Sequence, residues 1–566
     1  VQQYADGSPF MATAVLRGMV ESGVLTVDGK TWRVDNDKLS TFQAAEDAGE
    51  ILVGRLSQLP EEARKLLSAA AVIGKEFSVD AAADLAGMTT ADAAAAIKLV
   101  RRQRLVWSRP DSILSFVHDK IRETVLAGLS DQIIRSLHGQ IGRRLETTEP
   151  ERVFDLAYHF DAAEMHDHAL PYALKAADAA RNSFSLASAE SQLLIATRAF
   201  EHAPREVRHH VEMMMSDVLM LQGEYDRCSQ WLDDAERSAV TDIEKAKVAL
   251  KRGELFFKRG NKDKAVVHYE ASLKRLGQPV YSNSLRLWWD LTVELLRQTR
   301  NTLFPSSCGK RGSSPSEADR MVLSLYSRIS QAYWYTRDKY CTLWAHLRGM
   351  NLAERYQPTA FLAQSYSEHA PGMTLLRWES RGIKYAKRSL EIRKQLDDVW
   401  GQGQSRNFLS IMLYSFSRFE DCVSQARQAV AILERTGDYW EVHIARYQLA
   451  AALYRLGEFQ EAVRHARTNY ESAIDRGDYQ ATGNILDVWA RASMGEIPIE
   501  IVQSELDRDV FDPQRICQVK LAKGVHEFYQ GRYAEACLLY TSPSPRDEQF
   551  HLVCRLLLEN RGGGGG

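Results

Sequence analysis

The feature that most constrains the fold is a helix-pair signature that recurs between about residues 337 and 540. Successive copies of one turn position lie 40, 40, 40, 38 and 36 residues apart, at Arg337, Arg377, Ser417, Gly457, Gly495 and Gly531. A single helix pair cannot bury its own apolar face, so such copies stack on one another. The period therefore predicts an array of stacked helix pairs.

The residues after most of the turn positions follow a common pattern. Two places on comes an aromatic or apolar residue, and three further comes a small residue or cysteine, as in Gly457, Phe459 and Ala462. The same pattern follows Ser417 and Gly531. A small residue lets the chain turn sharply, the aromatic fills the turn, and a small residue at helical spacing lets the two backbones approach.

An earlier copy carries a family resemblance. Small, aromatic, turn, alanine, aromatic and small positions succeed one another at Gly253, Phe256, Gly260, Ala265, Tyr269 and Ser272. These offsets resemble those of a tetratricopeptide repeat, and the resemblance covers residues 206–540. The usual repeat is about 34 residues long. The longer period here is similar to the helix pairs of bacterial regulatory ATPases.

The composition of the chain indicates which partners and which compartment to expect. The chain has 566 residues, of which 45% are hydrophobic and 26% are charged, with a net charge of −2. Because this net charge is close to zero, the chain as a whole does not attract nucleic acid or an anionic membrane electrostatically. The seven cysteines form no Cys-x-x-Cys pair, which predicts buried thiols in a reducing compartment. With no signal peptide and no long apolar run, we expect a cytoplasmic protein that contacts no membrane.

The chain before the repeats predicts a small hairpin. Residues 11–21 are predicted to form a helix, with Ser8 as its N-cap and Pro9 in its first turn. β-branched and aromatic residues then flank Asp28-Gly29, which is the pattern of a hairpin. Gly29-Lys30-Thr31 also invites interpretation as a phosphate-binding P-loop. However, Gly23 is one residue too far away, and a strand rather than a helix is expected next.

Residues 51–145 predict a winged helix. We expect helices near residues 50–58, 61–73, 78–86 and 90–103, and a hairpin formed by residues 105–107 and 113–117. DNA binding would require base-reading side chains on the 90–103 helix. That helix is mostly alanine on its exposed side, with arginines only at its end. Packing within the protein is therefore favoured over DNA binding, and we expect no nucleic-acid partner.

Two short motifs resemble the signal-transduction ATPases with numerous domains (the STAND class). They are Gly7-Ser-Pro9 at a helix start and Phe116-Val-His118-Asp119 after the wing. The resemblance implies that residues 1–50 end an ATPase module. It also places Pro9 against adenine and His118 near the β-phosphate of ADP, with Val117 where the family has methionine. The alternative for His118 is a histidine that only caps its helix.

The remaining boundaries follow the repeat register. We expect a first tetratricopeptide-like array at 146–277, an amphipathic helix and linker at 278–316, a second array at 317–537, and a non-native tail at 538–566. Asn182 and Gly223 are expected to continue the turn register. His159, His166 and His168 lack the partners of a metal site, so we interpret them as solvated or capping residues.

No catalytic motif is present, so we expect this segment not to be an enzyme. The resemblance implies a regulatory segment of a nucleotide-switched ATPase. The winged helix would gate an ATPase core in cis, and the concave face of the solenoid would bind a protein or peptide. ATP or ADP would bind only the full-length protein. Two alternatives stay open: a Ser/Thr kinase, histidine kinase or cyclase with its catalytic domain elsewhere, and a transcription activator with its DNA-binding domain elsewhere.

Overall fold

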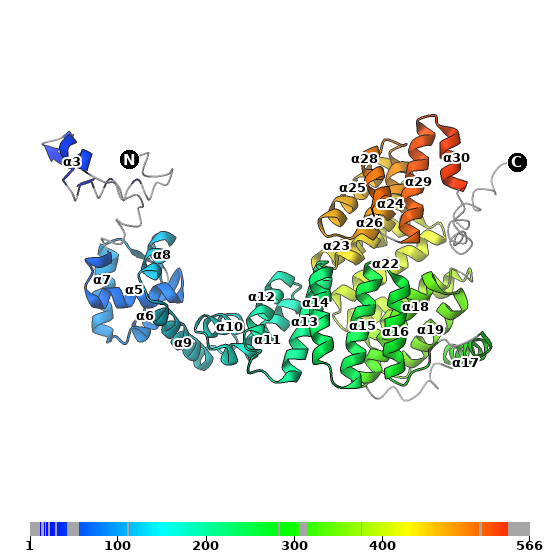
Figure 1. Cartoon of the computed structure of the whole chain (residues 1–566), viewed down its shortest axis with the longest axis horizontal. Helices are drawn as coiled ribbons and strands as arrows, with labels where there is room; N and C mark the ends of the chain where they lie inside the picture. The colour runs from blue at the N-terminus through cyan, green and yellow to red at the C-terminus, as the bar shows by residue number, and fades with distance from the viewer. Residues whose placement is uncertain are drawn as a thin grey trace. The chain divides into compact units, whose positions relative to one another are not determined.

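The computed structural model describes residues 12, 16, 19–20, 23–28, 31–41, 56–109, 113–280, 284–304, 314–374, 376–508 and 512–541. The chain forms two compact units, Val1–Asp178 with Ser191–Ala203 and Ala179–Glu190 with Pro204–Gly566. Both units are mainly helical, and Figure 1 colours the chain from blue at the N-terminus to red. Pro9 and the tail beyond residue 541 lie outside the described residues.

The predicted N-terminal hairpin is confirmed. Strands β1 (Leu25–Asp28) and β2 (Thr31–Val34) pair antiparallel, and helix α3 (Asn36–Thr41) follows. The segment after Gly29-Lys30 is therefore a strand, as expected. A P-loop would need a helix there to direct backbone N–H groups at phosphate.

Four helices and a three-stranded antiparallel sheet come next. The order is α5 (Glu61–Ile73), β3 (Glu76–Ser78), α6 (Val79–Leu85), α7 (Thr90–Arg102), β4 (Val106–Ser108), β5 (Ile113–Phe116) and α8 (Asp119–Ala127). β5 lies between β3 and β4 in the sheet. Leu66, Phe77 and Phe116 are buried in the shared core. The helices predicted at 61–73, 78–86 and 90–103 and the hairpin match the structure, whereas the helix predicted near 50–58 lies mostly outside the described residues. Strand β3 was missed because it has only three residues.

Four further helices continue from this region. They are α9 (Asp131–Thr148), α10 (Val153–Ala162), α11 (His166–Asn182) and α12 (Leu186–Thr197). α9 and α10 pack closely because Gly142 faces the Phe160 ring, where an added Cβ would lie 2.8 Å away. The register prediction at Asn182 is wrong. Asn182 is still helical, and Phe184 adopts the left-handed turn conformation, with φ 60°.

The second unit is built from successive antiparallel helices (Figure 1). Its first part comprises α13 (Arg205–Gln222), α14 (Tyr225–Ser238), α15 (Asp242–Lys258), α16 (Lys262–Arg275), α17 (Ser284–Leu303), α18 (Glu317–Thr336), α19 (Lys339–Ala353), α20 (Ala360–Gly372) and α21 (Glu379–Gln395). Its second part comprises α22 (Val399–Ser415), α23 (Phe419–Thr436), α24 (Tyr439–Leu456), α25 (Phe459–Asp475), α26 (Tyr479–Asn484), α27 (Leu486–Ala492), α28 (Ile499–Asp507), α29 (Pro513–Tyr529) and α30 (Tyr533–Thr541). This arrangement is the predicted tetratricopeptide-like solenoid.

The aligned turn positions share one backbone conformation. Five of the six are left-handed, with φ between 51° and 84°, at Arg377, Ser417, Gly457, Gly495 and Gly531. Glycine adopts this conformation without strain, whereas other residues pay a steric penalty. Arg337 is the exception, because it has extended backbone and the next residue caps α19 instead.

At the turns of Ser417, Gly457 and Gly531 the aromatic residue that follows fills the turn, as predicted. Its ring packs against an aromatic residue five places earlier, in the last turn of the preceding helix. Ring centroids are 5.4 to 5.8 Å apart in the pairs Tyr414–Phe419, Tyr454–Phe459 and Phe528–Tyr533. The small residues three places on, Cys422, Ala462 and Ala536, are buried.

The first helices of successive pairs form an inner layer. α15 contacts α13 and α18, α20 contacts α18 and α22, and α24 contacts α22. α24 also contacts α13, so the layer closes on itself within this unit. The ion pair between Lys262 and Asp512 likewise joins repeats that are far apart in the sequence. We call helices α13, α15, α18, α20, α22 and α24 the inner layer.

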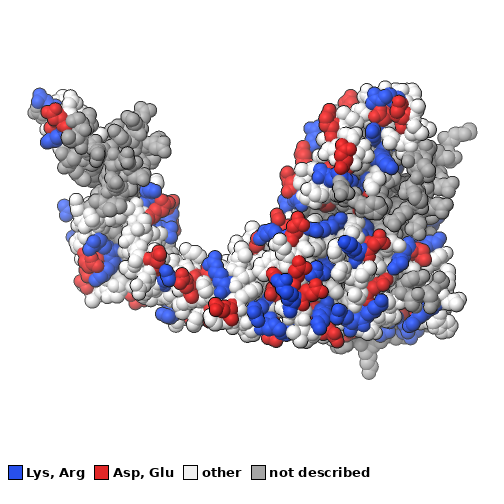
Figure 2. All heavy atoms as spheres, in the orientation of Figure 1, with Lys and Arg blue, Asp and Glu red and all other residues white. Residues whose placement is uncertain are grey.

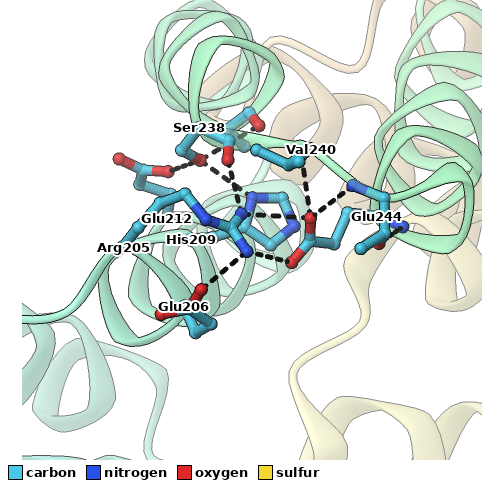
Figure 3. Close-up of polar contacts among 9 residues, drawn as sticks. Arg205, Glu206, His209, Glu212, Ser238, Val240 and Glu244 are labelled. Carbon is cyan, nitrogen blue, oxygen red and sulfur yellow. Dashed lines mark hydrogen bonds and ion pairs between the residues drawn. The ribbon is translucent and has the colours of Figure 1, made fainter.

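A polar clamp fixes the start of this layer (Figure 3). The Arg205 guanidinium donates to both carboxylate oxygens of Glu244 at 3.0 and 3.1 Å. Glu244 also accepts from the backbone N–H of Val240 at 2.8 Å. The hydrogen bonds from Arg205 are the main cause that lowers the pKa of Glu244 to about 2. The clamp ties α13 to the α14–α15 connection.

Candidate binding surface on the inner helix layer

A chain of charged side chains links the first three inner helices. Lys251 of α15 lies 2.8 Å from the Asp217 carboxylate of α13 and 2.9 Å from Glu254 on its own helix. The Glu254 carboxylate accepts in turn from Arg328 Nε of α18 at 3.0 Å. Opposite charges thus bridge α13 to α15 and α15 to α18.

Polar contacts continue from α18 to α20. The Glu368 carboxylate of α20 accepts from Gln331 of α18 at 3.1 Å, from Ser327 of α18, and from Gln364 of its own helix at 2.8 Å. Three neutral donors therefore surround one carboxylate. Burial raises the pKa of Glu368, and these donors only partly oppose that effect.

The chain of polar contacts extends through α22 to α24. Ser367 of α20 donates to Ser405 of α22 at 2.9 Å. Gln404 and Asn407 of α22 donate to the Glu441 carboxylate of α24 at 2.7 and 3.4 Å. The side-chain carbonyl oxygens of Gln404 and Asn407 are buried and find no hydrogen-bond partner in the part of the chain that the structure describes.

The carboxylates of the inner layer fall into two electrostatic classes. Burial pushes the pKa of Glu254 upward, but Lys251 and Arg328 outweigh burial and lower the pKa to about 2. Burial, followed by the nearby Asp438 carboxylate, raises the pKa of Glu441. Glu254 is therefore a fixed anion, whereas Glu368 and Glu441 hold protons more readily.

Several of these charges reach solvent although protein surrounds them. The side chains of Arg328, Lys251 and Glu254 are 30%, 25% and 11% exposed. Charges are costly to bury without water or a partner. Their accessible atoms are available to a polar ligand that enters between the inner helices.

An aromatic and cationic cluster adjoins this surface. Lys258 Nζ lies 3.6 Å from the Asp438 carboxylate and 5.5 Å from the centroid of the Trp440 ring. The Phe257 ring packs edge-on against Trp440 at 6.1 Å and against Tyr335 at 6.2 Å. Such rings offer apolar contact area beside the charged groups.

The structure shows His118 as the N-cap of α8. Its Nδ1 accepts from the backbone N–H of Lys120 at 3.1 Å, and its side chain is exposed. Because Nδ1 is an acceptor, the neutral ring carries its proton on Nε2. The neighbouring Asp119 forms an ion pair with Lys75 at 3.1 Å. Pro9 lies outside the described residues, so its role stays a prediction.

The interpretation of His159 as solvated or capping is wrong. His159 is 6% exposed, and its Nδ1 lies 2.8 Å from Nδ1 of His138, which is equally buried. Burial and the neighbouring His138 lower the pKa of His159 to about 4. No cluster of three or more potential metal-ligating side chains occurs among the described residues.

Ser238, His209 and Glu212 meet in a constellation that resembles a hydrolase triad (Figure 3). His209 Nδ1 lies 2.9 Å from Ser238 Oγ, but the same hydroxyl donates to Glu212. Glu212 therefore binds the serine, whereas a triad carboxylate would orient the histidine. His209 and Glu212 are also buried, so the group serves the packing of α13 against α14.

The expectation of buried cysteines is confirmed in part. Cys228, Cys341 and Cys422 are buried as predicted, but Cys537 is exposed.

The charged side chains of the surface are mixed in sign. Acidic and basic side chains intermingle on the face shown in Figure 2. Among the described residues, no helix combines the length and apolar character that crossing a membrane requires.

Sequence reasoning missed the inner-layer residues because each of them is individually an ordinary polar residue. A signal was nevertheless present. Gln364 and Gln404 occupy the same repeat position, and so do Arg328 and Glu368. Polar residues that recur at one repeat position on the first helices mark the face that successive repeats share.

Comparison with known proteins gives distant structural similarity. No family model matches the chain, and no curated protein matches it. A Rap protein complexed with competence and sporulation factor aligns with a TM-score of 0.45 and 12% identity, over 69% of this chain and 99% of that one. A STAND protein with a tetratricopeptide-repeat sensor from Pyrococcus horikoshii aligns with a TM-score of 0.34 and 13% identity, over 99% and 70%.

Aspartyl phosphate phosphatase F from Bacillus subtilis also aligns, with a TM-score of 0.36 and 12% identity, over 69% of this chain and 94% of that chain. These scores and identities are low. The similarities therefore do not define the function of this chain, which has to be inferred from its own residues.

Proposed function

We propose that the solenoid is a protein-interaction domain that binds an extended peptide segment along its inner layer. The observation that carries this proposal is the continuous polar wall from α13 to α24, which includes partly accessible charges at Lys251 and Arg328. An inner wall that served only packing would be apolar, because apolar side chains fill space without a desolvation penalty.

The chemistry of the wall suits a peptide. Gln331 and Gln364 are half-buried and carry both amide donors and carbonyl acceptors, so they match the alternating groups of an extended backbone. The mixed charges of Glu254 and Arg328 would select charged side chains of the ligand. Helix pairs that present a shared face are well suited to long, extended ligands.

A displayed random-peptide library selected against the purified chain tests this proposal. Peptides enriched on the unaltered protein should lose about tenfold or more in affinity for Arg328→Gln, on the scale of one charge-assisted hydrogen bond. Arg427→Gln is the matched control, because Arg427 pairs with Glu461 on outer helices. Peptides whose affinity is unchanged by Arg328→Gln and by Gln331→Ala would contradict the proposal.

A second candidate function rests on the residues around His118. We infer that residues 56–127 form a winged helix, since three helices and a sheet of order β3-β5-β4 have that connectivity. His118 caps α8 through Nδ1, and its imidazole lies at the exposed start of that helix. The start of a helix, with its N–H groups and dipole, suits a phosphate. The winged helix would then gate an ATPase core that binds ADP.

Two substitutions in the full-length protein separate capping from nucleotide contact. His118→Asn retains an N-cap acceptor, whereas His118→Ala removes it. If the imidazole contacts ADP, both variants should weaken ADP binding by about 1 to 3 kcal/mol. If His118 only caps α8, calorimetric titration should give unchanged ADP affinity for His118→Asn, and the nucleotide role would be rejected.

A further inference from the structure

A polar cleft lies between α17, α20 and α21 in the second unit. Its volume is about 370 Å³, and its wall includes Thr302, Glu354, Trp378, Arg381, Lys384 and Arg388. Small-molecule sites start at about 300 Å³. The inner-layer helix α20 contributes Tyr366 to the cleft, but none of the polar side chains proposed to bind peptides lines it.

Arg381 is held in a fixed orientation in this cleft. Its guanidinium lies over the Trp378 ring at 5.3 Å and over the Tyr385 ring at 4.8 Å. Its Nε donates to His369 Nε2 at 3.1 Å, and its Nη2 donates to Thr302 at 3.2 Å. The two rings and the Thr302 hydroxyl carry no charge. His369 is neutral as well, because burial holds its pKa well below its usual value.

The other two cations of the cleft also lack an acidic partner. Arg388 lies over the Tyr366 ring at 5.6 Å, and Lys384 is exposed. Within the described residues no ion pair joins Arg381, Lys384 or Arg388 to a carboxylate. The one acidic side chain of the cleft, Glu354, accepts instead from Asn301 at 2.8 Å and from Tyr366 at 3.2 Å.

The positions of these groups give the cleft an excess of positive charge. Elsewhere on α21, Arg393 pairs with Asp398, whereas the three cations of the cleft face neutral partners or solvent. Two planar guanidinium groups and one ammonium group match the oxygens of a phosphate dianion. The exposed Trp378 ring, 52% accessible, offers a stacking surface beside them.

We propose that this cleft binds a small organic phosphate, with the phosphate monoester held by Arg381, Lys384 and Arg388. The remainder of the ligand would lie against Trp378. Asn301 lines the same cleft, and its side-chain carbonyl has no hydrogen-bond partner in the described part of the chain. It supplies an acceptor for a ligand hydroxyl, as a sugar phosphate or nucleoside monophosphate would carry.

Isothermal titration of the unaltered chain with four probes tests the proposal. AMP and ribose 5-phosphate should bind, inorganic phosphate should bind more weakly, and adenosine should give no signal. Tighter binding of AMP than of ribose 5-phosphate would assign the stacking role to Trp378. Equal affinities for AMP and ribose 5-phosphate would mean that only the phosphate and the sugar are recognised. That result would support the phosphate site but not the stacking role of Trp378.

Two lysine variants on α21 separate binding in the cleft from a general effect of charge. Lys384→Gln should weaken AMP binding about tenfold, the scale of one charge-assisted contact. Lys387→Gln removes the same charge from an exposed position of α21 that does not line the cleft, so it should leave AMP binding unchanged. Arg388→Gln should also weaken binding, with thermal unfolding monitored to verify folding.

Two results would overturn the proposal. One is the absence of heat from every phosphate probe at millimolar concentration. The other is an equal loss for Lys384→Gln and Lys387→Gln, which would mean that phosphate is attracted only by the general charge of α21. Loss of peptide binding by inner-layer variants would not alter either result, so the two proposals fail independently.

Discussion

Lys262 and Asp512 form an ion pair in which the two side chains are only 5% and 1% exposed, although 250 residues separate them in the chain. Asp512 also caps α29, because its carboxylate accepts from the backbone N–H of Gln514 at 2.9 Å. Lys262 lies at the start of α16 and packs over the Tyr335 ring at 5.1 Å. The pair thus joins repeats from the two ends of the second unit.

Lys262→Met should lower the free energy of unfolding by about 3 kcal/mol, because the Asp512 carboxylate would stay buried without its counter-ion. Adding Asp512→Asn removes that charge while keeping a capping side chain, so the double variant should recover most of the loss. Urea denaturation measures all three proteins. Strictly additive losses would show that the ion pair contributes no coupling.

Gly253→Ala should destabilise the second unit by about 2 kcal/mol, the scale of an overpacked core. A Cβ at Gly253 would lie 2.4 Å from the buried Tyr269 ring. Gly457→Ala is the comparison, because nothing lies within 4 Å of its Cβ position and only its φ of +83° is strained. Its cost should be about 1 kcal/mol. Equal denaturation midpoints would refute the close approach at Gly253.

Ser417→Gly should stabilise the protein by about 0.5 kcal/mol. Ser417 has a φ of 59°, where a side chain costs more than the extra freedom that glycine gains in the unfolded chain. Ser415→Gly is the matched control two residues earlier. Ser415 is the last residue of α22 and still helical, so glycine should destabilise there by about 0.5 kcal/mol. A lower melting temperature for Ser417→Gly would contradict the prediction.

Stability of the first unit should fall as the pH drops from about 6.5 toward 4, because of His138 and His159. Burial is the main cause that lowers both pKa values, with that of His159 at about 4. An unfolded histidine titrates near about 6.5. Between these values the unfolded chain binds more protons, so stability that is complete above pH 6.5 is lost on acidification.

Thermal unfolding followed by calorimetry at several pH values between 7.5 and 4.5 measures this dependence. His159→Gln cannot be protonated, so its melting temperature should vary less over the same range. If the unaltered protein and His159→Gln lose stability in parallel, the buried pair is not the source of the acid sensitivity.

The sequence by itself determined the local structure. Glycine at positions such as Gly457, aromatic residues such as Phe459 and small residues such as Ala462 act within one helix pair. Their effects depend on backbone sterics and on neighbours close in the chain. The repeat period, most helix boundaries and the two hairpins were therefore predictable. The strand β3 was not, because three residues carry too little periodicity to be recognised.

Only the tertiary structure decided which residues meet across repeats. The contact between Lys262 and Asp512, and the bond from Gln404 to Glu441, depend on the small rotation that each helix pair adds to the last. The cationic cleft likewise combines Thr302 and Arg381 from separate repeats. Such rotations arise from the packing of many side chains and accumulate along the array, so no single local pattern in the sequence specifies them.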